Sequence, residues 1–166
     1  DSYELRGKTV GIVGGGAIGR MVMQRLQGWD CKLIYSDPYR MPEEMEKKLN
    51  CEYVSLETLL RESDVVSLHC PLTEQTRGMI GKEQLAMMKP NAIIVNEARG
   101  AVIDDKALVE ALQNGTIWGA AIDTWEKEPL DPNDPLVKME KVITTSHLGA
   151  ATRETVIRCF SIGYQN

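Results

Sequence analysis

A glycine-rich turn between two apolar segments constrains the fold of this chain more than any other feature. Residues 10–13 are apolar, Gly14, Gly16 and Gly19 follow them, and Asp37 comes eighteen residues after the last glycine. Gly14 permits a tight turn from strand to helix, Gly16 lets the backbone approach a pyrophosphate, and Gly19 lets the helix pack closely on a sheet. The N–H groups at the helix start would hold the phosphates, and Asp37 would bind the adenosine ribose. The pattern predicts a dinucleotide-binding unit.

Two other interpretations of the turn remain open from these residues alone. One is a structural glycine turn in another kind of α/β protein. The other is a methyltransferase, which also combines a glycine-rich first turn with an acid after the second strand and would bind S-adenosylmethionine. Asp37 favours NAD over NADP because a carboxylate repels the 2′-phosphate, but Arg40 lies close enough in sequence to offer that phosphate a positive charge.

Length and composition narrow the class of protein further. A chain of 166 residues fits one domain with a sizeable core. The net charge is −5 and no basic cluster occurs, which argues against nucleic acid as a partner. No apolar run is long enough to cross a membrane, and no signal-peptide pattern occurs at the first residues. The four cysteines form no Cys-x-x-Cys pair, which indicates no metal site and favours a cytoplasmic location.

Apolar segments alternate with segments of helical periodicity along the whole chain. Strands are expected at residues 10–13, 31–35, 51–54, 64–69, 92–96, 117–122 and 141–145. Helices are expected from residue 17, at 42–49, 56–61, 82–88 and 104–112, and from about 151 to the terminus. This alternation predicts a single α/β domain built on a Rossmann-type doubly wound parallel sheet.

Polar and glycine residues follow the ends of these strands. In an open parallel sheet, ligands bind in the crevice beyond the carboxyl ends of the strands, so residues far apart in sequence are expected to meet there. The residues placed at that edge are Gly14, Asp37, Pro71, Arg99, Asp123 and His147.

Three of these edge residues suggest acid–base chemistry on a keto acid. Imidazole in general titrates near neutral pH, so His147 could exchange the proton of a hydroxyl/carbonyl pair, and Glu128 could orient it by a hydrogen bond. The guanidinium of Arg99 suits a substrate carboxylate. Asp123 could hold the nicotinamide carboxamide. The alternatives are a helix-capping His147 with a solvated Glu128, a surface Arg99 at a helix terminus, and a capping Asp123.

Four sequence blocks together resemble a known family. They are residues 7–20, 69–80 and 96–104, and residues 121–130 continuing at 146–150. In this order they resemble the D-isomer-specific 2-hydroxyacid dehydrogenases, the family that includes D-3-phosphoglycerate dehydrogenase. The resemblance covers essentially the whole chain.

The resemblance implies an NAD-dependent oxidoreductase that interconverts a D-2-hydroxy acid and a 2-keto acid. It implies that Arg99, Glu128 and His147 are catalytic. It also implies that the cofactor contacts Gly14, Gly16, Ala17, Ile18, Gly19, Asp37, Cys70, Pro71, Thr76, Glu97, Ala98, Asp123, His147, Gly149 and Ala150. Two positions depart from the family: Glu97 replaces a small or hydroxyl side chain, and Ser146 replaces a proline.

The resemblance also bears on domain organisation. Family members have a second domain that supplies part of the substrate pocket. We therefore expect residues 1–166 to be the NAD-binding domain alone, with the helix from about residue 151 resembling the helix that returns between domains. Such a piece should bind NAD and turn over weakly or not at all. Relatives usually dimerise through this domain, which makes a homodimer one expectation. An NAD-sensing module of the same fold, like the corepressors that resemble this family, is the alternative function.

Overall fold

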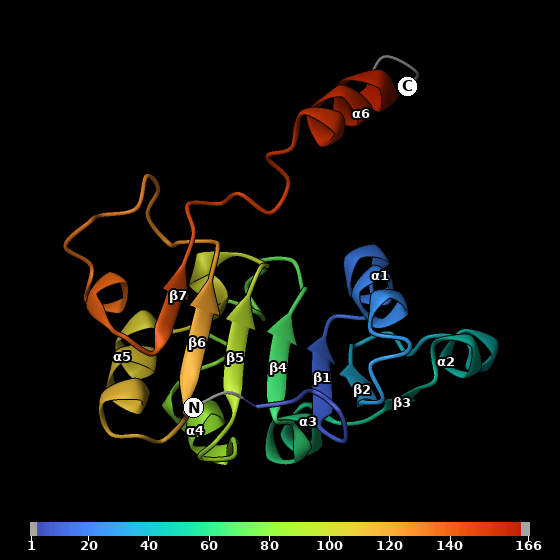
Figure 1. Ribbon diagram of the computed structural model, residues 1–166, viewed down its shortest axis with the longest axis horizontal. Helices are drawn as coiled ribbons and strands as arrows, with labels where there is room; N and C mark the ends of the chain where they lie inside the picture. Colours follow the sequence, from blue (N-terminus) through green and yellow to red (C-terminus); the bar gives the residue numbers. More distant parts are fainter. Residues whose placement is uncertain (1–2, 164–166) are drawn as a thin grey trace.

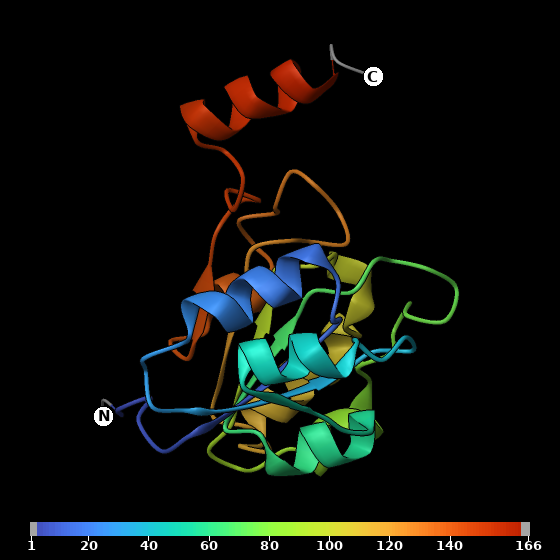
Figure 2. The ribbon, with the colours of Figure 1, turned by 90° about the vertical axis from the view of Figure 1, so that its right-hand side faces the viewer.

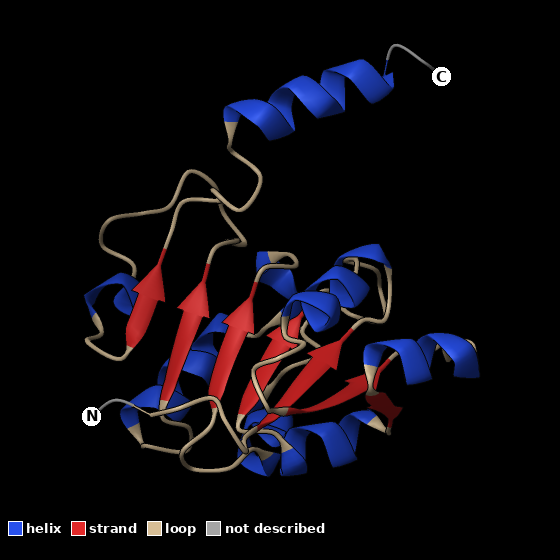
Figure 3. Ribbon diagram, turned by 45° about the vertical axis from the view of Figure 1, so that its right-hand side comes forward, coloured by secondary structure: helices blue, strands red, loops and turns tan. Residues whose placement is uncertain are grey.

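The computed structural model describes the backbone of residues 3–163 and the side chains of residues 3–158. Seven parallel strands form one sheet in the order β3-β2-β1-β4-β5-β6-β7, and all of them point toward the same edge (Figures 1 and 3). The strands are β1 (Thr9–Val13), β2 (Lys32–Ser36), β3 (Cys51–Tyr53), β4 (Val65–Leu68), β5 (Ile93–Asn96), β6 (Gly119–Ile122) and β7 (Val142–Thr144). The predicted doubly wound parallel sheet is confirmed.

Helices cover both faces of the sheet, as the alternating pattern predicted (Figure 2). They are α1 (Ala17–Arg25), α2 (Glu43–Leu49), α3 (Leu56–Glu62), α4 (Lys82–Met87) and α5 (Asp105–Gln113), and a further helix, α6 (Arg153–Gly163), follows β7. Helix α1 contacts α2 on one face, and α3 contacts α4, which contacts α5, on the other. None of the helices in residues 3–163 is both long and apolar enough to span a bilayer.

Alternating residues of β1 show how the two faces are divided. A Cβ on Gly11 would collide with Leu59 of α3 and with Ser63, the residue that follows this helix, so this position faces α3. Ile12 is fully buried on the other face, where its side chain approaches Gly19 of α1. Since successive side chains of a strand point to opposite faces, one five-residue strand serves both halves of the core.

The ends of the helices follow the local sequence. The carboxylate of Asp104 accepts hydrogen bonds from the N–H groups of Lys106 and Ala107 at 3.0 and 3.1 Å, and thereby caps α5 as predicted. Gly115, with φ +69°, follows the other end of α5. The sequence did not predict two short 3-10 helices, η1 (Gly100–Val102) and η2 (Pro135–Lys138), because a single turn carries no hydrophobic period.

Helix α6 extends away from the sheet, beyond the carboxyl ends of the strands (Figures 1 and 2). It begins at Arg153, close to the expected residue 151. The last part of that predicted helix, residues 164–166, lies outside the described residues.

Candidate active site

The glycine-rich turn lies where the strand order reverses. Strand β1 pairs with β2 on one side and with β4 on the other, so Gly14 stands at the switch point of the sheet. Its φ is +105°, and a Cβ there would lie 2.8–2.9 Å from backbone atoms of His69 and Cys70. Gly14 is therefore required by both conformation and space.

Gly19 and Gly16 lie in different surroundings, which match the two roles that the sequence predicted for them. A Cβ on Gly19 would overlap the carbonyl oxygen of Gly14, so α1 can approach β1 only with glycine at this position. A Cβ on Gly16 would meet nothing within 4 Å, so this position faces open space. The open space at Gly16 is what a bound pyrophosphate would need.

The first turn of α1 offers hydrogen-bond donors. Asp104 and Ser55 cap α5 and α3 with their side chains, but no side chain caps α1 at Gly16. The first N–H groups of α1, at Ala17 and Ile18, are therefore free to bind an anion together with the helix dipole. The residues of this turn fit the diphosphate of NAD.

Asp37 lies directly beyond β2 and contacts the same turn. Its Oδ2 accepts a hydrogen bond from the N–H of Gly15 at 2.7 Å, and its Oδ1 accepts one from the N–H of Tyr39 at 2.8 Å. These bonds hold the carboxylate beside the glycine turn and leave further lone pairs for a ribose.

Asp123 organises the turn that carries His147. Its carboxylate accepts hydrogen bonds from the hydroxyl of Thr145 and from the N–H groups of Leu148 and Gly149 at 2.8 and 3.0 Å. Burial opposes ionisation, but these donors outweigh it and hold the pKa of Asp123 below its ordinary value. His147 itself adopts φ +59°, and its N–H donates to the carbonyl of Asp123 at 2.7 Å.

His147 and Glu128 form the predicted pair. The Nδ1 of His147 lies 2.9 and 3.1 Å from the two carboxylate oxygens of Glu128. The bond to His147, followed by one from the N–H of Trp125, lowers the pKa of Glu128, which is therefore ionised at neutral pH. With Nδ1 bound to a carboxylate, the proton sits on this nitrogen and Nε2 is the atom left for chemistry. In the part of the chain that the structure describes, Nε2 has no hydrogen-bond partner.

Arg99 completes one cavity with this pair. A cavity of about 410 Å³ is lined by side chains from three loops, those after β4, β5 and β6, and from the turn after β7. Arg99 is anchored by a hydrogen bond from Nη1 to the carbonyl of Ala98 at 2.6 Å. The cavity residues are Leu72, Arg77, Arg99, Gly100, Ala101, Trp125, Glu126, Glu128 and His147.

The remaining predicted cofactor residues lie around the switch point. The hydroxyl of Thr76 donates to the carbonyl of Pro71 at 2.6 Å and so shapes the loop after β4. Burial raises the pKa of the Cys70 thiol, which is half-buried in the same loop. Glu97 is exposed, and its Oε2 would lie 3.5 Å from a Cβ on Gly149.

Ala98 and Ala150 differ in their surroundings. Ala98 is buried, and its N–H donates to the side chain of Asn96 at 3.1 Å. Ala150 is exposed in the turn after His147. Like the other predicted site residues, both alanines lie at the edge of the sheet formed by the carboxyl ends of the strands.

His69 lies at the end of β4, beside the loop that carries Cys70 and Pro71. Its Nε2 lies 2.8 Å from the hydroxyl of Ser67, and burial lowers its pKa. Within residues 3–158, no group of three or more His, Cys, Asp and Glu side chains is arranged to hold a metal ion.

Sequence reasoning missed the residues that support the site. Gly15 positions Asp37 through its N–H. The buried Trp125 donates its indole N–H to the carbonyl of Thr145 at 2.8 Å, and its backbone N–H contacts Glu128. These contacts join positions up to 22 residues apart or use backbone atoms, so no local motif marks them.

The fold and the site together define a doubly wound dinucleotide-binding domain with a cavity lined by ionisable side chains at the carboxyl ends of its strands. The family model described as "D-isomer specific 2-hydroxyacid dehydrogenase, NAD binding domain" matches residues 1–149. The chain belongs to this family and is its NAD-binding domain. The family assignment excludes the methyltransferase interpretation.

Individual relatives agree with this assignment. A glyoxylate reductase of Korarchaeum cryptofilum is 49% identical over 164 residues, which cover 99% of this chain and 49% of that protein. A D-3-phosphoglycerate dehydrogenase of Methanocaldococcus jannaschii is 47% identical over 152 residues, which cover 91% of this chain and 29% of that protein. The crystal structure of D-lactate dehydrogenase with NAD⁺ from Lactobacillus jensenii superposes with a TM-score of 0.91 at 36% identity, covering 99% of this chain and 53% of that one. The chain thus spans about half the length of the glyoxylate reductase that it matches.

Proposed function

We propose that this chain is the cofactor-binding half of an enzyme that reduces a small 2-keto acid to the D-2-hydroxy acid. The observation that carries the proposal is the shared cavity of Arg99, Glu128 and His147, with the imidazole held by the carboxylate at 2.9 Å. An anion-binding group and a proton donor in one cavity are what a keto acid requires.

Each of the three residues has a role that follows from its contacts. Arg99 binds the substrate carboxylate and polarises the neighbouring carbonyl. Glu128 binds Nδ1 of His147, fixes the orientation of the ring and leaves Nε2 available. His147 donates the proton to the carbonyl oxygen from Nε2. When bound, the reduced nicotinamide supplies the hydride.

The small size of the substrate is supported by relatives of known name. The Korarchaeum relative is a glyoxylate reductase at 49% identity, so we propose glyoxylate and similarly small 2-keto acids as the substrate class. Residues 1–166 then make up the NAD-binding domain, with α6 as the connection toward a substrate-binding domain. A homodimer in the cytoplasm is part of the proposal, and analytical ultracentrifugation and cell fractionation test these two points.

The test is steady-state keto-acid reduction with NADH by the full-length protein and its variants. His147→Asn should lower kcat by about 10²–10⁴-fold because it removes the proton donor. Arg99→Met should raise KM by about 10–100-fold because it removes a charged hydrogen-bond donor for the substrate. Arg77→Met is the matched control, since Arg77 lines the same cavity but lies 3.7 Å from Glu126 in an exposed ion pair.

Two results would contradict the proposal. Tight NADH binding by a protein that reduces no 2-keto acid would favour the NAD-sensing module instead. Equal effects of Arg99→Met and Arg77→Met would show that Arg99 has no specific contact with the substrate.

A further inference from the structure

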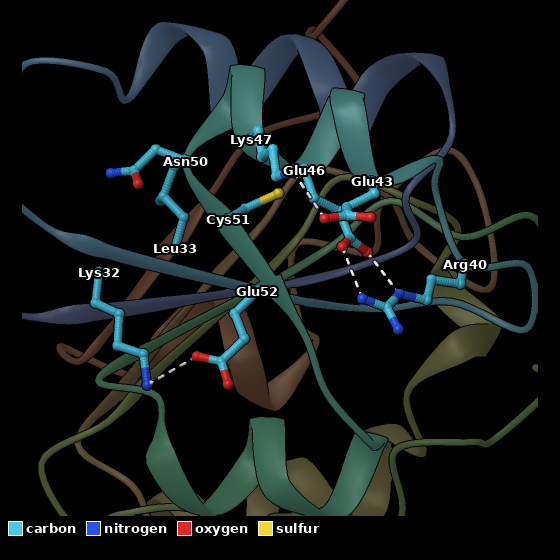
Figure 4. Close-up of a pocket in the computed structure, with 9 residues that line it drawn as sticks. All are labelled: Lys32, Leu33, Arg40, Glu43, Glu46, Lys47, Asn50, Cys51 and Glu52. Atoms are coloured by element: carbon cyan, nitrogen blue, oxygen red, sulfur yellow. Dashed lines mark hydrogen bonds and ion pairs between the residues drawn. The ribbon is translucent and has the colours of Figure 1, made fainter.

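Arg40, the one feature near Asp37 that could favour NADP, is bound to a carboxylate on α2. Its Nε donates to Oε1 of Glu46 at 2.9 Å, and its Nη2 donates to Oε2 at 2.8 Å (Figure 4). Two parallel bonds of this kind are charge-assisted and fix the orientation of the guanidinium. The guanidinium also lies over the ring of Tyr53, 5.4 Å from its centroid.

Glu46 is itself held firmly, so it is a strong partner for Arg40. It is only 7% exposed, and its Oε1 also accepts a hydrogen bond from the hydroxyl of Tyr35 at 2.6 Å. The bonds from Arg40 and then from Tyr35 lower the pKa of Glu46 to about 2, so it is ionised throughout the physiological range. Releasing Arg40 would leave this buried carboxylate without its counter-charge, which is strongly unfavourable.

The same cluster frames the loop that carries Asp37. The fully buried hydroxyl of Tyr35 accepts the N–H of Met41 at 2.8 Å, and the hydroxyl of Tyr53 donates to the carbonyl of Asp37 at 3.3 Å. Arg40 is therefore three residues from Asp37 in sequence but is directed toward α2.

Two other cations that line the groove beside α2 also have carboxylate partners. A groove of about 660 Å³ beside α2 contains Lys32 and Lys47 besides Arg40 (Figure 4). Lys32 lies 3.5 and 3.3 Å from carboxylates of Glu52 and Glu62, and Lys47 lies 2.7 Å from Glu43. The groove thus offers no uncompensated positive charge to an added phosphate.

We propose that Glu46 is a positioning residue for cofactor specificity: by holding Arg40, it denies the 2′-phosphate of NADP a counter-charge and so adds to the selection of NAD by Asp37. The inference rests on the proposed function only in that the glycine turn and Asp37 hold a dinucleotide. It assigns a part in choosing the cofactor to α2, none of whose residues lines the cavity of Arg99, Glu128 and His147.

The test is calorimetric titration of the protein with NADH and with NADPH. The starting background is Asp37→Ser, which removes the carboxylate that repels the phosphate. Adding Glu46→Gln, which keeps an acceptor for Tyr35, should raise the affinity for NADPH relative to NADH by about ten-fold, the value of one charged hydrogen bond. Adding Glu43→Gln instead is the matched control and should leave the ratio nearly unchanged, because Glu43 forms its ion pair with the exposed Lys47 and does not hold the Arg40 guanidinium as Glu46 does.

A third substitution separates specificity from general damage. Arg40→Met on the Asp37→Ser, Glu46→Gln background should abolish the gain, because the released guanidinium is the proposed partner of the phosphate. An unchanged ratio after Glu46→Gln, or a gain that survives Arg40→Met, would overturn the inference. Equal weakening of both cofactors would also overturn it, because it would make Glu46 merely structural.

A further comparison does not depend on how well the Glu46 variant folds. In the Asp37→Ser protein, Arg40→Met should leave the NADPH affinity within about two-fold, since Arg40 is still held by Glu46. A larger loss would show that Arg40 already reaches the phosphate and would contradict the proposal. Failure of the unsubstituted protein to bind NADH would instead count against the proposed function.

Discussion

The glycine turn and the catalytic cavity lie at the same edge of the sheet but are built in different ways. The turn is made of backbone, and contacts under 3 Å leave no space for a side chain on Gly14. The cavity is made of side chains on long loops, and the side chains of His147 and Glu128 are 43% and 42% exposed. The turn holds its shape within one short segment, whereas the cavity depends on several segments.

This difference indicates which part of the function each region can perform alone. A backbone cradle binds a ligand through groups that every residue has, so its requirement is the absence of Cβ atoms. An acid–base site needs particular side chains in particular orientations. Substitutions should therefore separate the two regions: some should remove turnover without changing cofactor affinity, and others should do the reverse.

The largest difference between the effect on turnover and the effect on cofactor affinity is expected from Glu128→Gln in the full-length protein. The amide can still accept a hydrogen bond from Nδ1 of His147, but it lacks the negative charge of the carboxylate and binds the ring more weakly. We expect kcat to fall about 100-fold with NADH affinity unchanged.

Glu126→Gln is the matched control for this prediction, because Glu126 lines the same cavity and pairs with Arg77 instead of His147. Steady-state kinetics and calorimetry measure the two quantities. A similar kcat for Glu128→Gln and the unsubstituted protein would remove Glu128 from the site.

Within the glycine turn, substitutions should likewise distinguish the glycine needed for folding from the glycine needed for cofactor binding. Gly19→Ala would place a methyl group against the carbonyl oxygen of Gly14 and should lower the free energy of unfolding by about 1–3 kcal/mol. Gly16→Ala meets no protein atom, so its free energy of unfolding should stay unchanged while NADH affinity falls. Urea denaturation and calorimetry check both variants. Unaltered NADH binding by Gly16→Ala would show that the pyrophosphate does not approach this residue.

The smallest expected effect concerns the acidic surroundings of the loop that carries Glu128. Burial, followed by the charges of Asp134 and Glu126 on that loop, raises the pKa of Asp105 on α5 to about 6. With this raised pKa, the folded protein holds the proton of Asp105 more tightly than the unfolded chain does. The free energy of unfolding therefore falls as the pH rises from about 4 to about 6, and it stays lower above pH 6. Asp105→Asn should therefore stabilise the protein by about 1 kcal/mol at pH 8, after allowance for partial exposure.

The pH dependence and the neighbouring aspartate provide the controls. The gain from Asp105→Asn should shrink as the pH falls through 6 and vanish near 4. Asp104→Ala should have the opposite sign and cost about 1 kcal/mol, since it removes the cap of α5. Denaturant titrations at several pH values measure both. A gain that is independent of pH would contradict the electrostatic explanation.

Most of the fold could be predicted because each of its signals is local. The apolar strands and the helical periods identified every strand of the sheet and all six α-helices, to within a few residues at their ends. The pairing order of the strands does not follow from such periods, and neither do the 3-10 helices at residues 100–102 and 135–138.

The candidate site could be predicted only in part. The positions of Arg99, Asp123 and His147 followed from strand ends, because parallel strands end at one edge. The roles of Gly15, Thr145 and Trp125 did not, since they act through hydrogen bonds between segments that are distant in sequence. Asp123 accepts hydrogen bonds from two N–H groups of the turn after β7, and the residues next to Asp123 in the sequence do not reveal these bonds.

By itself, the sequence determined the βαβ cradle, because Gly14, Gly16 and Gly19 lie within six residues and their spacing between a strand and a helix predicts it. Only the tertiary structure decided the partner of Arg40, which the sequence left free to serve a 2′-phosphate and the fold binds to Glu46. It also decided between the two arrangements that the sequence left open for Glu128 and His147, because the fold brings these residues into contact across nineteen positions. The physical reason is that steric requirements are local, whereas a charge interacts with whatever partner the folded chain brings within hydrogen-bond distance.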